Sequence, residues 1–303
     1  VKFVICTHWH DDHIKGLSRV LEECSNALFC MPSVNDKQKF LNYVNLDCAK
    51  TENGSISSFL EFKKCLNVIK GRKKQPKRLK ADLVICQRKF KPTSGVSFPI
   101  ELYSLSPSES VITHFDKEIS QLFKTFDLNK KSIPEKSANE KSTVIYFKYG
   151  EFTAILGADL EVSKNKNEGW YDIKNNSEVL KGKSIIYKIP HHGSSNGYNE
   201  EIFTHLVKQN AVLKLSPWNR NTKLPKVEML KKYKNHSDKI YITSSLEISK
   251  KPKKRDKSSI KLIKLFSRRL SEVKFDKGIV RTRHSLLNPN TIKTETFGSA
   301  FQL

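Results

Sequence analysis

Three histidines and two aspartates lie within six consecutive residues near the start of the chain. They form the segment His8-Trp9-His10-Asp11-Asp12-His13, which directly follows the apolar run VKFVICT. Because side chains two residues apart in an extended backbone face the same way, His8 and His10 can converge on one ion. As the chain turns toward a helix, Asp12 and His13 can point at a second ion nearby. Imidazole and carboxylate ligands suit Zn²⁺ or Mn²⁺, so the segment predicts a site for two divalent metal ions.

Two later motifs offer the further ligands that such a site needs. Asp159 follows the small residues Gly157 and Ala158, which let the backbone approach closely, at the end of a predicted strand. The pair His191 and His192 also follows a predicted strand. Loops at strand ends are where α/β folds carry their chemistry, so we expect these side chains to meet the first cluster.

Taken together, the motifs resemble those of the metallo-β-lactamase-fold hydrolases. HWHDDH at 8–13 matches the HxHxDH signature of that family, GAD at 157–159 is similar to its strand-end aspartate, and HHGS at 191–194 is similar to its final histidine motif. The resemblance is strongest to the hydrolase domain of ComEC-type DNA-uptake proteins and its stand-alone relatives, some of which accompany bacterial antiphage systems. Further segments fit this subgroup: Leu105-Ser106-Pro107, residues 139–142, and Asn219 before Pro225.

This resemblance implies an α/β (α+β) protein with two sheets packed face to face and helices outside, an αββα sandwich. Carried over residue by residue, it assigns these ligands: His8 and His10 to the first ion, Asp12 and His13 to the second, and Asp159 to both. One of His191 and His192 completes the second site. We favour His192 as the ligand and His191 as a substrate-facing or supporting group.

The sequence departs from the family pattern in two places. Family members usually carry one more histidine between the first cluster and the bridging aspartate, and here that position falls near Asn139. Asn139 is therefore a candidate first-site or substrate neighbour, in a subgroup where Asn and Ser are common, and the first site is expected to be weak or completed by water. The chain also begins at the strand before the histidine cluster, so the family's earlier strands are expected to be missing.

The expected chemistry follows from the metal pair. Two ions about 3.5–4 Å apart lower the pKa of a shared water and stabilise charge on a displaced oxygen. The expected nucleophile is a metal-bound hydroxide, oriented by Asp12 or Asp159. His191 would stabilise the developing charge or protonate the leaving group, which makes Asp12 and His191 the candidate catalytic residues.

Apolar periodicity predicts the elements that must position these motifs. Strands are expected at 1–7, 100–105, 143–149, 152–159, 184–189, 211–216 and 239–244, and near 278–283 and 294–301. Helices are expected after the histidine cluster, where Ile14, Leu17, Leu21 and Cys24 recur at helical spacing, and at 119–126, 199–208 and 226–233. Gly150-Glu151 predicts a tight hairpin. We expect one domain, 1–303, with a lysine-rich insertion or long loop region at about 32–98.

Composition and charge bound the partners. The 303 residues carry a formal net charge of +24, which favours a polyanion, although a biased lysine and asparagine content can also produce such a charge. The basic runs at 63–80 and 249–255 are either solvated loops or contacts to a phosphate backbone. Arg281 and Arg283 alternate along a predicted strand and so share a face.

The compartment is inferred from what the sequence contains. No apolar stretch is long enough for a membrane helix, and the start carries no basic region before an apolar run, so we expect no membrane association. The six cysteines form no CxxC pair and are expected to be reduced thiols of a cytoplasmic protein.

These observations predict a metal-dependent hydrolase, in first place a phosphodiesterase or nuclease that acts on nucleic acid or another phosphodiester. One alternative is a hydrolase of small phosphoesters or other esters. A second alternative is a catalytically degenerate sensor or assembly module of a defence system. A companion defence-system protein is a partner that the resemblance alone implies.

Overall fold

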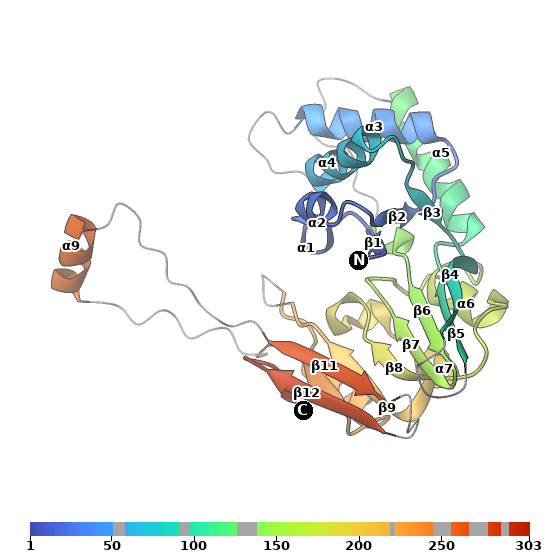
Figure 1. Ribbon diagram of the computed structural model, residues 1–303, viewed down its shortest axis with the longest axis vertical. Coiled ribbons are helices and arrows are strands. Elements are labelled where there is room, and N and C mark those ends of the chain that lie inside the picture. The colour runs from blue at the N-terminus through green and yellow to red at the C-terminus, as the bar shows by residue number, and fades with distance from the viewer. Residues whose placement is uncertain are drawn as a thin grey trace.

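The computed structural model describes residues 1–50, 58–90, 97–125, 138–218, 222–244, 256–266, 278–285 and 291–303. In these residues the chain is a mixed α/β protein with a large mixed sheet and a smaller parallel one (Figure 1). Asn219 and the basic run 249–255 lie outside the described residues.

The small sheet carries the histidine cluster at one of its edges. Its strands run parallel in the order β1-β2-β3, with bounds β1 Phe3–Ile5, β2 Leu28–Pro32 and β3 Lys77–Leu79. Five helices pack on its outer face: α1 Asp11–Ile14, α2 Leu17–Glu23, α3 Lys37–Lys50, α4 Ser58–Gly71 and α5 Glu109–Thr125. One buried cluster joins the sheet to its helices. It contains Phe29 of β2, Phe62 of α4, Phe115 of α5 and Trp9 of the loop after β1, so apolar burial holds that loop in place.

The large sheet has eight strands in the order β13-β10-β9-β8-β7-β6-β5-β4. Their bounds are β4 Leu83–Phe90, β5 Phe98–Ser104, β6 Ile145–Tyr149, β7 Phe152–Leu156, β8 Ser184–Lys188, β9 Val207–Leu215, β10 Ile240–Ile242 and β13 Phe301–Gln302. Strands β4 to β7 are antiparallel, whereas β7 to β10 are parallel. Because β7 and β8 are parallel neighbours, the loops after them meet at one edge of the sheet.

Helices cover one face of this sheet. They are α6 Gly169–Asn176, α7 Glu200–Leu206 and α8 Val227–Lys234. Trp170, Phe203 and Tyr233 from these helices are buried with Tyr187 of the sheet. Helix α7 begins at an N-cap, because the side chain of Asn199 accepts a hydrogen bond from the backbone N–H of Ile202 at 3.1 Å.

The opposite face of the large sheet meets two different partners. Cys30 and Leu79 of the small sheet pack against Ile85 and Ile145 of the large sheet. Farther along the same face, a separate hairpin made of β11 Ile279–His284 and β12 Ile292–Phe297 contributes Ile292 to a second apolar cluster. This face of the large sheet therefore contacts both the small sheet and the hairpin, and helices α6 to α8 cover its other face.

Several sequence predictions are confirmed and others change. The Gly150-Glu151 hairpin between β6 and β7 is present, with Gly150 at φ 55°. The helix expected after the histidine cluster is split into α1 and α2, because Gly16 at φ 86° adopts a left-handed conformation. The region 32–98, expected to be a lysine-rich insertion or a long loop region, holds the regular elements α3, α4, β3 and β4 among its described residues, and that it is an insertion stays a prediction. No helix of the described part has the length and apolarity to cross a membrane.

Candidate metal centre

The loop after β1 carries the first group of side chains. Hydrogen bonds anchor it at both sides: the backbone N–H of Thr143 donates to the carbonyl of Thr7 at 2.8 Å, and Cys6 Sγ donates to the carbonyl of His8 at 3.2 Å. Helix α1 starts directly after His10, whose carbonyl accepts from the backbone N–H of His13 at 2.9 Å. A short strand followed at once by a helical turn thus presents successive side chains of the motif in different directions.

The loop after β7 carries the central carboxylate. Gly157 is required there, because an added Cβ would lie 2.9 Å from the carbonyl oxygen of Lys188 and 3.0 Å from Pro190 Cβ. Ala158 then adopts φ 45° and turns the chain. Asp159 follows and is nearly buried. The close approach expected from the small residues before Asp159 is therefore present.

The loop after β8 carries the histidine pair in a strained conformation. His191 and His192 both have positive φ, at 44° and 53°, in a short 3-10 turn, η3, of residues His191–Gly193. The backbone N–H of His191 donates to the carbonyl of Ala158 at 3.0 Å, which ties this loop to the previous one. Left-handed backbone at a residue with a Cβ costs on the order of 1–3 kcal/mol and is found mainly at functional sites.

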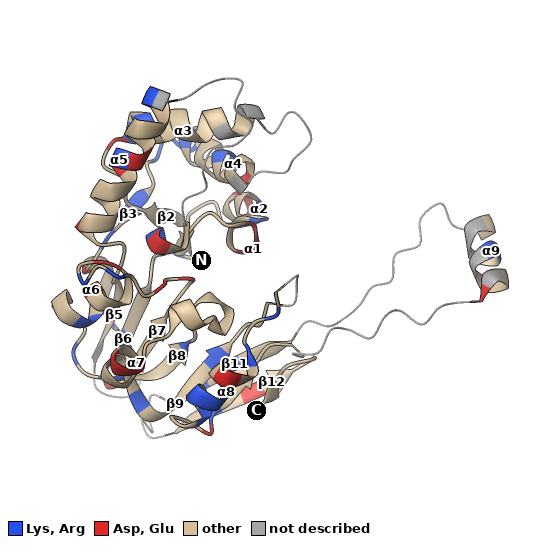
Figure 2. Cartoon of the chain, turned by 180° about the vertical axis from the view of Figure 1, so that it is seen from behind, with Lys and Arg blue, Asp and Glu red and all other residues tan. Residues whose placement is uncertain are grey.

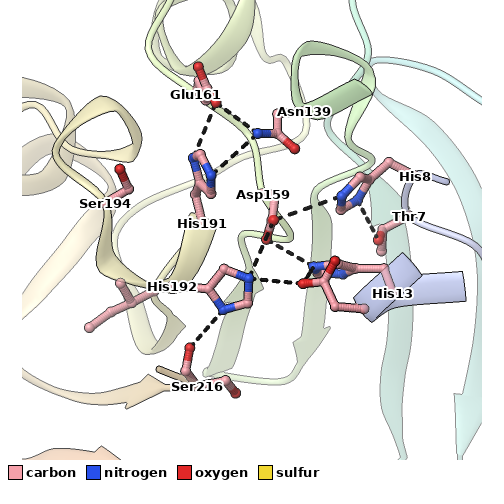
Figure 3. Close-up of polar contacts among 12 residues, drawn as sticks. Thr7, His8, His13, Asn139, Asp159, Glu161, His191, His192, Ser194 and Ser216 are labelled. Carbon is pink, nitrogen blue, oxygen red and sulfur yellow. Dashed lines mark hydrogen bonds and ion pairs between the residues drawn. The ribbon is translucent and has the colours of Figure 1, made fainter. Parts of the chain in front are cut away.

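These three loops bring two groups of potential ligands together around Asp159 (Figure 3). One group joins Asp12, His13, Asp159 and His192, and the other joins His8, His10 and Asp159, with one ligand atom per residue and all these atoms within 4.8 Å of one another. All six residues expected to be metal ligands therefore lie in this centre, and Asp159 is common to both groups.

The group of Asp12, His13, Asp159 and His192 is compact enough for a single ion. His13 Nε2 lies 3.2 Å from Asp159 Oδ1 and 3.3 Å from Asp12 Oδ2, and His192 Nε2 lies 3.0 Å from the same Asp12 oxygen. His192 Nδ1 contacts the carbonyl oxygen of Ser216 at 2.9 Å. Because a carbonyl only accepts, Nδ1 carries the proton and the lone pair of Nε2 faces the carboxylates. The geometry thus directs His192, not His191, at this group.

A buried ring nitrogen without a partner indicates that the residues fit a metal. Nε2 of His8 is buried and has no hydrogen-bond partner in the described part of the chain, whereas the buried Nε2 of His13 faces the carboxylate oxygens of Asp12 and Asp159. His8 is completely buried, and its Nε2 lies 3.8 Å from Asp159 Oδ2. Native structures rarely leave buried polar atoms unpaired unless an ion or water satisfies them. A donor set of imidazoles and carboxylates is one that Zn²⁺ or Mn²⁺ takes.

The electrostatics of the centre agree with this donor set. Burial lowers the pKa of His8 to about 3, so its imidazole is neutral, as metal binding requires. Burial also acts to lower the pKa of His13, but the carboxylates of Asp12 and Asp159 raise it to about 9. Burial opposes ionisation of Asp159, yet contact with His13 holds the pKa of that carboxyl at about 2. The carboxylates are therefore ionised at neutral pH.

His191 belongs to a neighbouring cluster that the sequence did not reveal. Asn139, in the 3-10 turn η2 Ala138–Lys141, donates from Nδ2 to Glu161 Oε1 at 2.8 Å and contacts His191 Nε2 at 3.3 Å. His191 Nδ1 lies 3.2 Å from the same Glu161 oxygen. Because Asn139 Nδ2 only donates, His191 Nε2 is the acceptor and Nδ1 carries the proton. Asn139 Oδ1 is buried and has no hydrogen-bond partner among the described residues.

Glu161 is thus the residue that sequence reasoning missed. It follows Asp159 by two residues, and a carboxylate at that spacing after a strand-end ligand is the signal that could have found it. Burial opposes the ionisation of Glu161, but contacts with His191 and Asn139 lower its pKa below the usual value. Glu161 therefore holds both neighbours through a charged oxygen.

Trp218 borders the centre, and its ring lies 5.3 Å from that of His192 between centroids. Trp9, within the signature, instead packs among Phe40, Phe59 and Phe115.

Comparison with protein-family models gives no match for this chain, and comparison with curated proteins gives none either.

Proposed function

We propose that the protein is a dinuclear metal-dependent hydrolase that cleaves phosphodiesters, with nucleic acid as the substrate. The observation that carries this proposal is the shared carboxylate: Asp159 belongs to both ligand groups, and each group has at least three ligand atoms within 4.8 Å. A carboxylate between two ions, with imidazoles on either side, is the arrangement that two-metal hydrolysis uses.

The order of layers in the fold supports the metallo-β-lactamase-fold family that the sequence motifs resemble. Three apolar clusters lie between four successive layers of the fold. In order, the layers are helices α1 to α5, the small sheet, the large sheet and helices α6 to α8. This order is compatible with the αββα sandwich that the resemblance of the HxHxDH, GAD and HHGS motifs to the metallo-β-lactamase fold implies, and it supports the proposal. The loops after β1, β7 and β8 supply the residues of the centre, as the resemblance implies.

Two divalent ions would supply the nucleophile by lowering the pKa of water and would stabilise charge on the leaving oxygen. The chain's own contribution is orientation. The side chain of His8 is fully buried, whereas those of Asp12 and His13 are 27% and 22% exposed, so substrate reaches the centre from the side of Asp12 and His13. Asp12 and Asp159 would orient the attacking water. His191, held at Nδ1 by Glu161, would exchange the contact of its Nε2 with Asn139 for one with the substrate or its leaving group.

Charge supports a polyanionic substrate. Lys and Arg number 55 against 31 Asp and Glu, and an excess of this size raises the local concentration of phosphate-bearing chains. Figure 2 shows basic residues on helices of both halves of the molecule. A small neutral ester would gain nothing from this charge.

The test is a cleavage assay with Mn²⁺ or Zn²⁺ on single-stranded and double-stranded DNA and RNA. It compares wild type with Asp159→Ala and with Asp11→Ala, a matched change at an exposed neighbour outside both ligand groups. We expect metal-dependent cleavage that Asp159→Ala abolishes and Asp11→Ala retains.

Other outcomes would replace the proposal. Two bound ions without nucleic-acid cleavage would favour a hydrolase of small phosphoesters or other esters. One ion or none per chain, together with no activity, would favour a degenerate sensor or assembly module.

A further inference from the structure

A groove of about 840 Å³ lies between α3, α4 and the segment that leads from α4 into β3. This volume falls within the roughly 300–1,000 Å³ range of ligand clefts. No residue of the metal centre lines the groove among its described lining residues. It is therefore a separate feature of the surface, and the proposed hydrolase activity does not account for it.

The floor of the groove is apolar. Met31, Val34, Phe40, Val44 and Ile69 close it and are each 5% exposed or less. Two leucines, Leu41 of α3 and Leu66 of α4, also line it and are partly exposed. A ligand with apolar groups would cover these two side chains and gain free energy from their burial.

The rim is positively charged, and its charges are uncompensated. Lys63 and Lys70 of α4 and Lys73 and Lys74 after it line the groove, and no Asp or Glu is among its described lining residues. Within the part of the chain that the structure describes, none of these four ammonium groups forms an ion pair or a hydrogen bond.

Nearby cations that do have partners show the contrast. Lys64 is the neighbour of Lys63 on the same helix but does not line the groove, and its Nζ lies 3.8 Å from Glu61. Lys37, on the opposite side of the groove, donates to Gln75 Oε1 at 2.8 Å. The four rim lysines therefore remain available to pair with an anionic ligand.

The shape and chemistry exclude several occupants. Phe40 is the one aromatic residue among the described lining and is 2% exposed, so nucleic-acid bases would find no surface for stacking. Lys63 and Lys70 are separated by about 10 Å along α4 at 1.5 Å per residue, and Lys73 and Lys74 extend the rim beyond them. A ligand with several anionic groups along its length can therefore pair with the whole rim.

Parts of this same protein are also excluded by charge. Helix α9, Lys257–Phe266, extends from the body of the molecule (Figure 1), but its sequence carries Lys257, Lys261 and Lys264. A second copy of the chain brings a net charge of +24. Both would be repelled by the rim.

We propose that this groove binds an acidic amphipathic helix of a partner protein. Apolar side chains at positions i, i+3, i+4 and i+7 of that helix lie on Leu41 and Leu66, and Asp or Glu side chains along its flanks pair with the rim lysines. The charges set the orientation and the association rate, whereas the apolar floor adds affinity.

The test measures binding of a synthetic fluorescent peptide to the full chain by anisotropy. The peptide consists of Glu and Leu, with Leu on one helical face, and its control is a scrambled isomer in which the leucines do not align. A single-stranded oligothymidylate of the same length is the second probe. Two protein variants carry the same charge change: Lys63→Glu with Lys70→Glu in the groove, and Lys231→Glu with Lys234→Glu on the exposed face of α8. A third, Leu66→Asn, alters the floor.

We expect the amphipathic peptide to bind wild type and the α8 variant alike, and the groove variant about tenfold more weakly. Leu66→Asn should also weaken binding at a temperature where a melting curve shows the variant to be folded, because Leu66 also packs against the buried cluster, and the scrambled peptide should bind poorly. Equal binding of the two peptides, equal loss in both charge variants, or no binding of the amphipathic peptide would overturn the proposal. An oligothymidylate that binds as well as the peptide and competes with it would assign the groove to nucleic acid instead.

Discussion

Replacing Glu161 with Gln should slow hydrolysis without removing either metal ion. Glu161 Oε1 accepts from Asn139 Nδ2 at 2.8 Å and lies 3.2 Å from His191 Nδ1. Gln keeps an oxygen in this place but loses the charge. Hydrogen bonds to charged groups contribute about 1.5–3 kcal/mol and neutral ones about 0.5–1.5 kcal/mol. For the one contact that orients His191, the difference of about 1–1.5 kcal/mol corresponds to about a tenfold lower rate.

Removing the oxygen altogether should cost more. Glu161→Ala leaves Asn139 and His191 without their common acceptor, and loss of a group that orients site residues typically costs 10–100-fold in activity. We therefore expect kcat to fall about tenfold in Glu161→Gln and by up to about 100-fold in Glu161→Ala, with little change in KM. The assay is initial-rate hydrolysis of bis(p-nitrophenyl) phosphate with Mn²⁺, together with metal content by mass spectrometry.

Glu200→Gln is the matched control. Glu200 Oε1 lies 2.8 Å from His236 Nε2, the same carboxylate–imidazole pairing outside the metal centre, so this variant should keep wild-type rates. Full activity in Glu161→Ala would refute the reasoning, because His191 would then need no support. Loss of an ion in Glu161→Gln would also refute it, since Glu161 would then act on the ligands themselves.

Three further predictions concern the centre and its backbone. Asp159→Ala should reduce the metal content from close to two ions per chain to one or none, measured by mass spectrometry after dialysis, whereas Asp11→Ala should retain both. In metal-free protein, the raised pKa of His13, about 9, means that its charged form stabilises the fold below about pH 6.5. This stabilisation is lost as the pH rises through 9. The melting temperature of wild type should therefore fall between about pH 6.5 and pH 9, and that of His13→Asn should change less over the same range. Gly157→Ala should lower the melting temperature, because overpacking typically costs about 1–3 kcal/mol, whereas Gly71→Ala, where an added Cβ meets nothing within 4 Å, should not.

Much of the centre could be predicted because its signals are local. His8 to His13 lie in one hexapeptide after a buried strand, and alternation along extended backbone is enough to separate two ligand pairs. Asp159 and His192 were found because each follows an apolar run that ends at a small or turn-forming residue. Parallel pairing of β7 with β8 then brings their loops together, which is why strand ends distant in sequence could be assigned to one site.

The parts that were missed depend on long-range packing. Asn139 and Glu161 are 22 residues apart, and Asn139 and His191 are 52 apart. No spacing rule joins residues at such distances, because their approach is set by the positive φ values after β7 and β8. The lysine run at 63–80 was predicted to be either a solvated loop or a contact to a phosphate backbone, because its composition alone does not place it in a helix. Its first half belongs to α4, and only the packing of α4 against α3 decides that Lys63 lines a groove while Lys64 reaches Glu61.

The strained loops explain how the fold and the centre depend on each other. Asp12 and His13 belong to the half that contains the small sheet, whereas Asp159 and His192 follow strands of the large sheet. Ordinary right-handed or extended backbone would carry His192 away from Asp12; the left-handed turn at 53° brings its Nε2 to 3.0 Å. That conformation costs free energy, and the buried clusters on both faces of the large sheet offset it. The free energy gained by packing the sheets therefore offsets the cost of the left-handed backbone, and this backbone places the two ligand groups around Asp159.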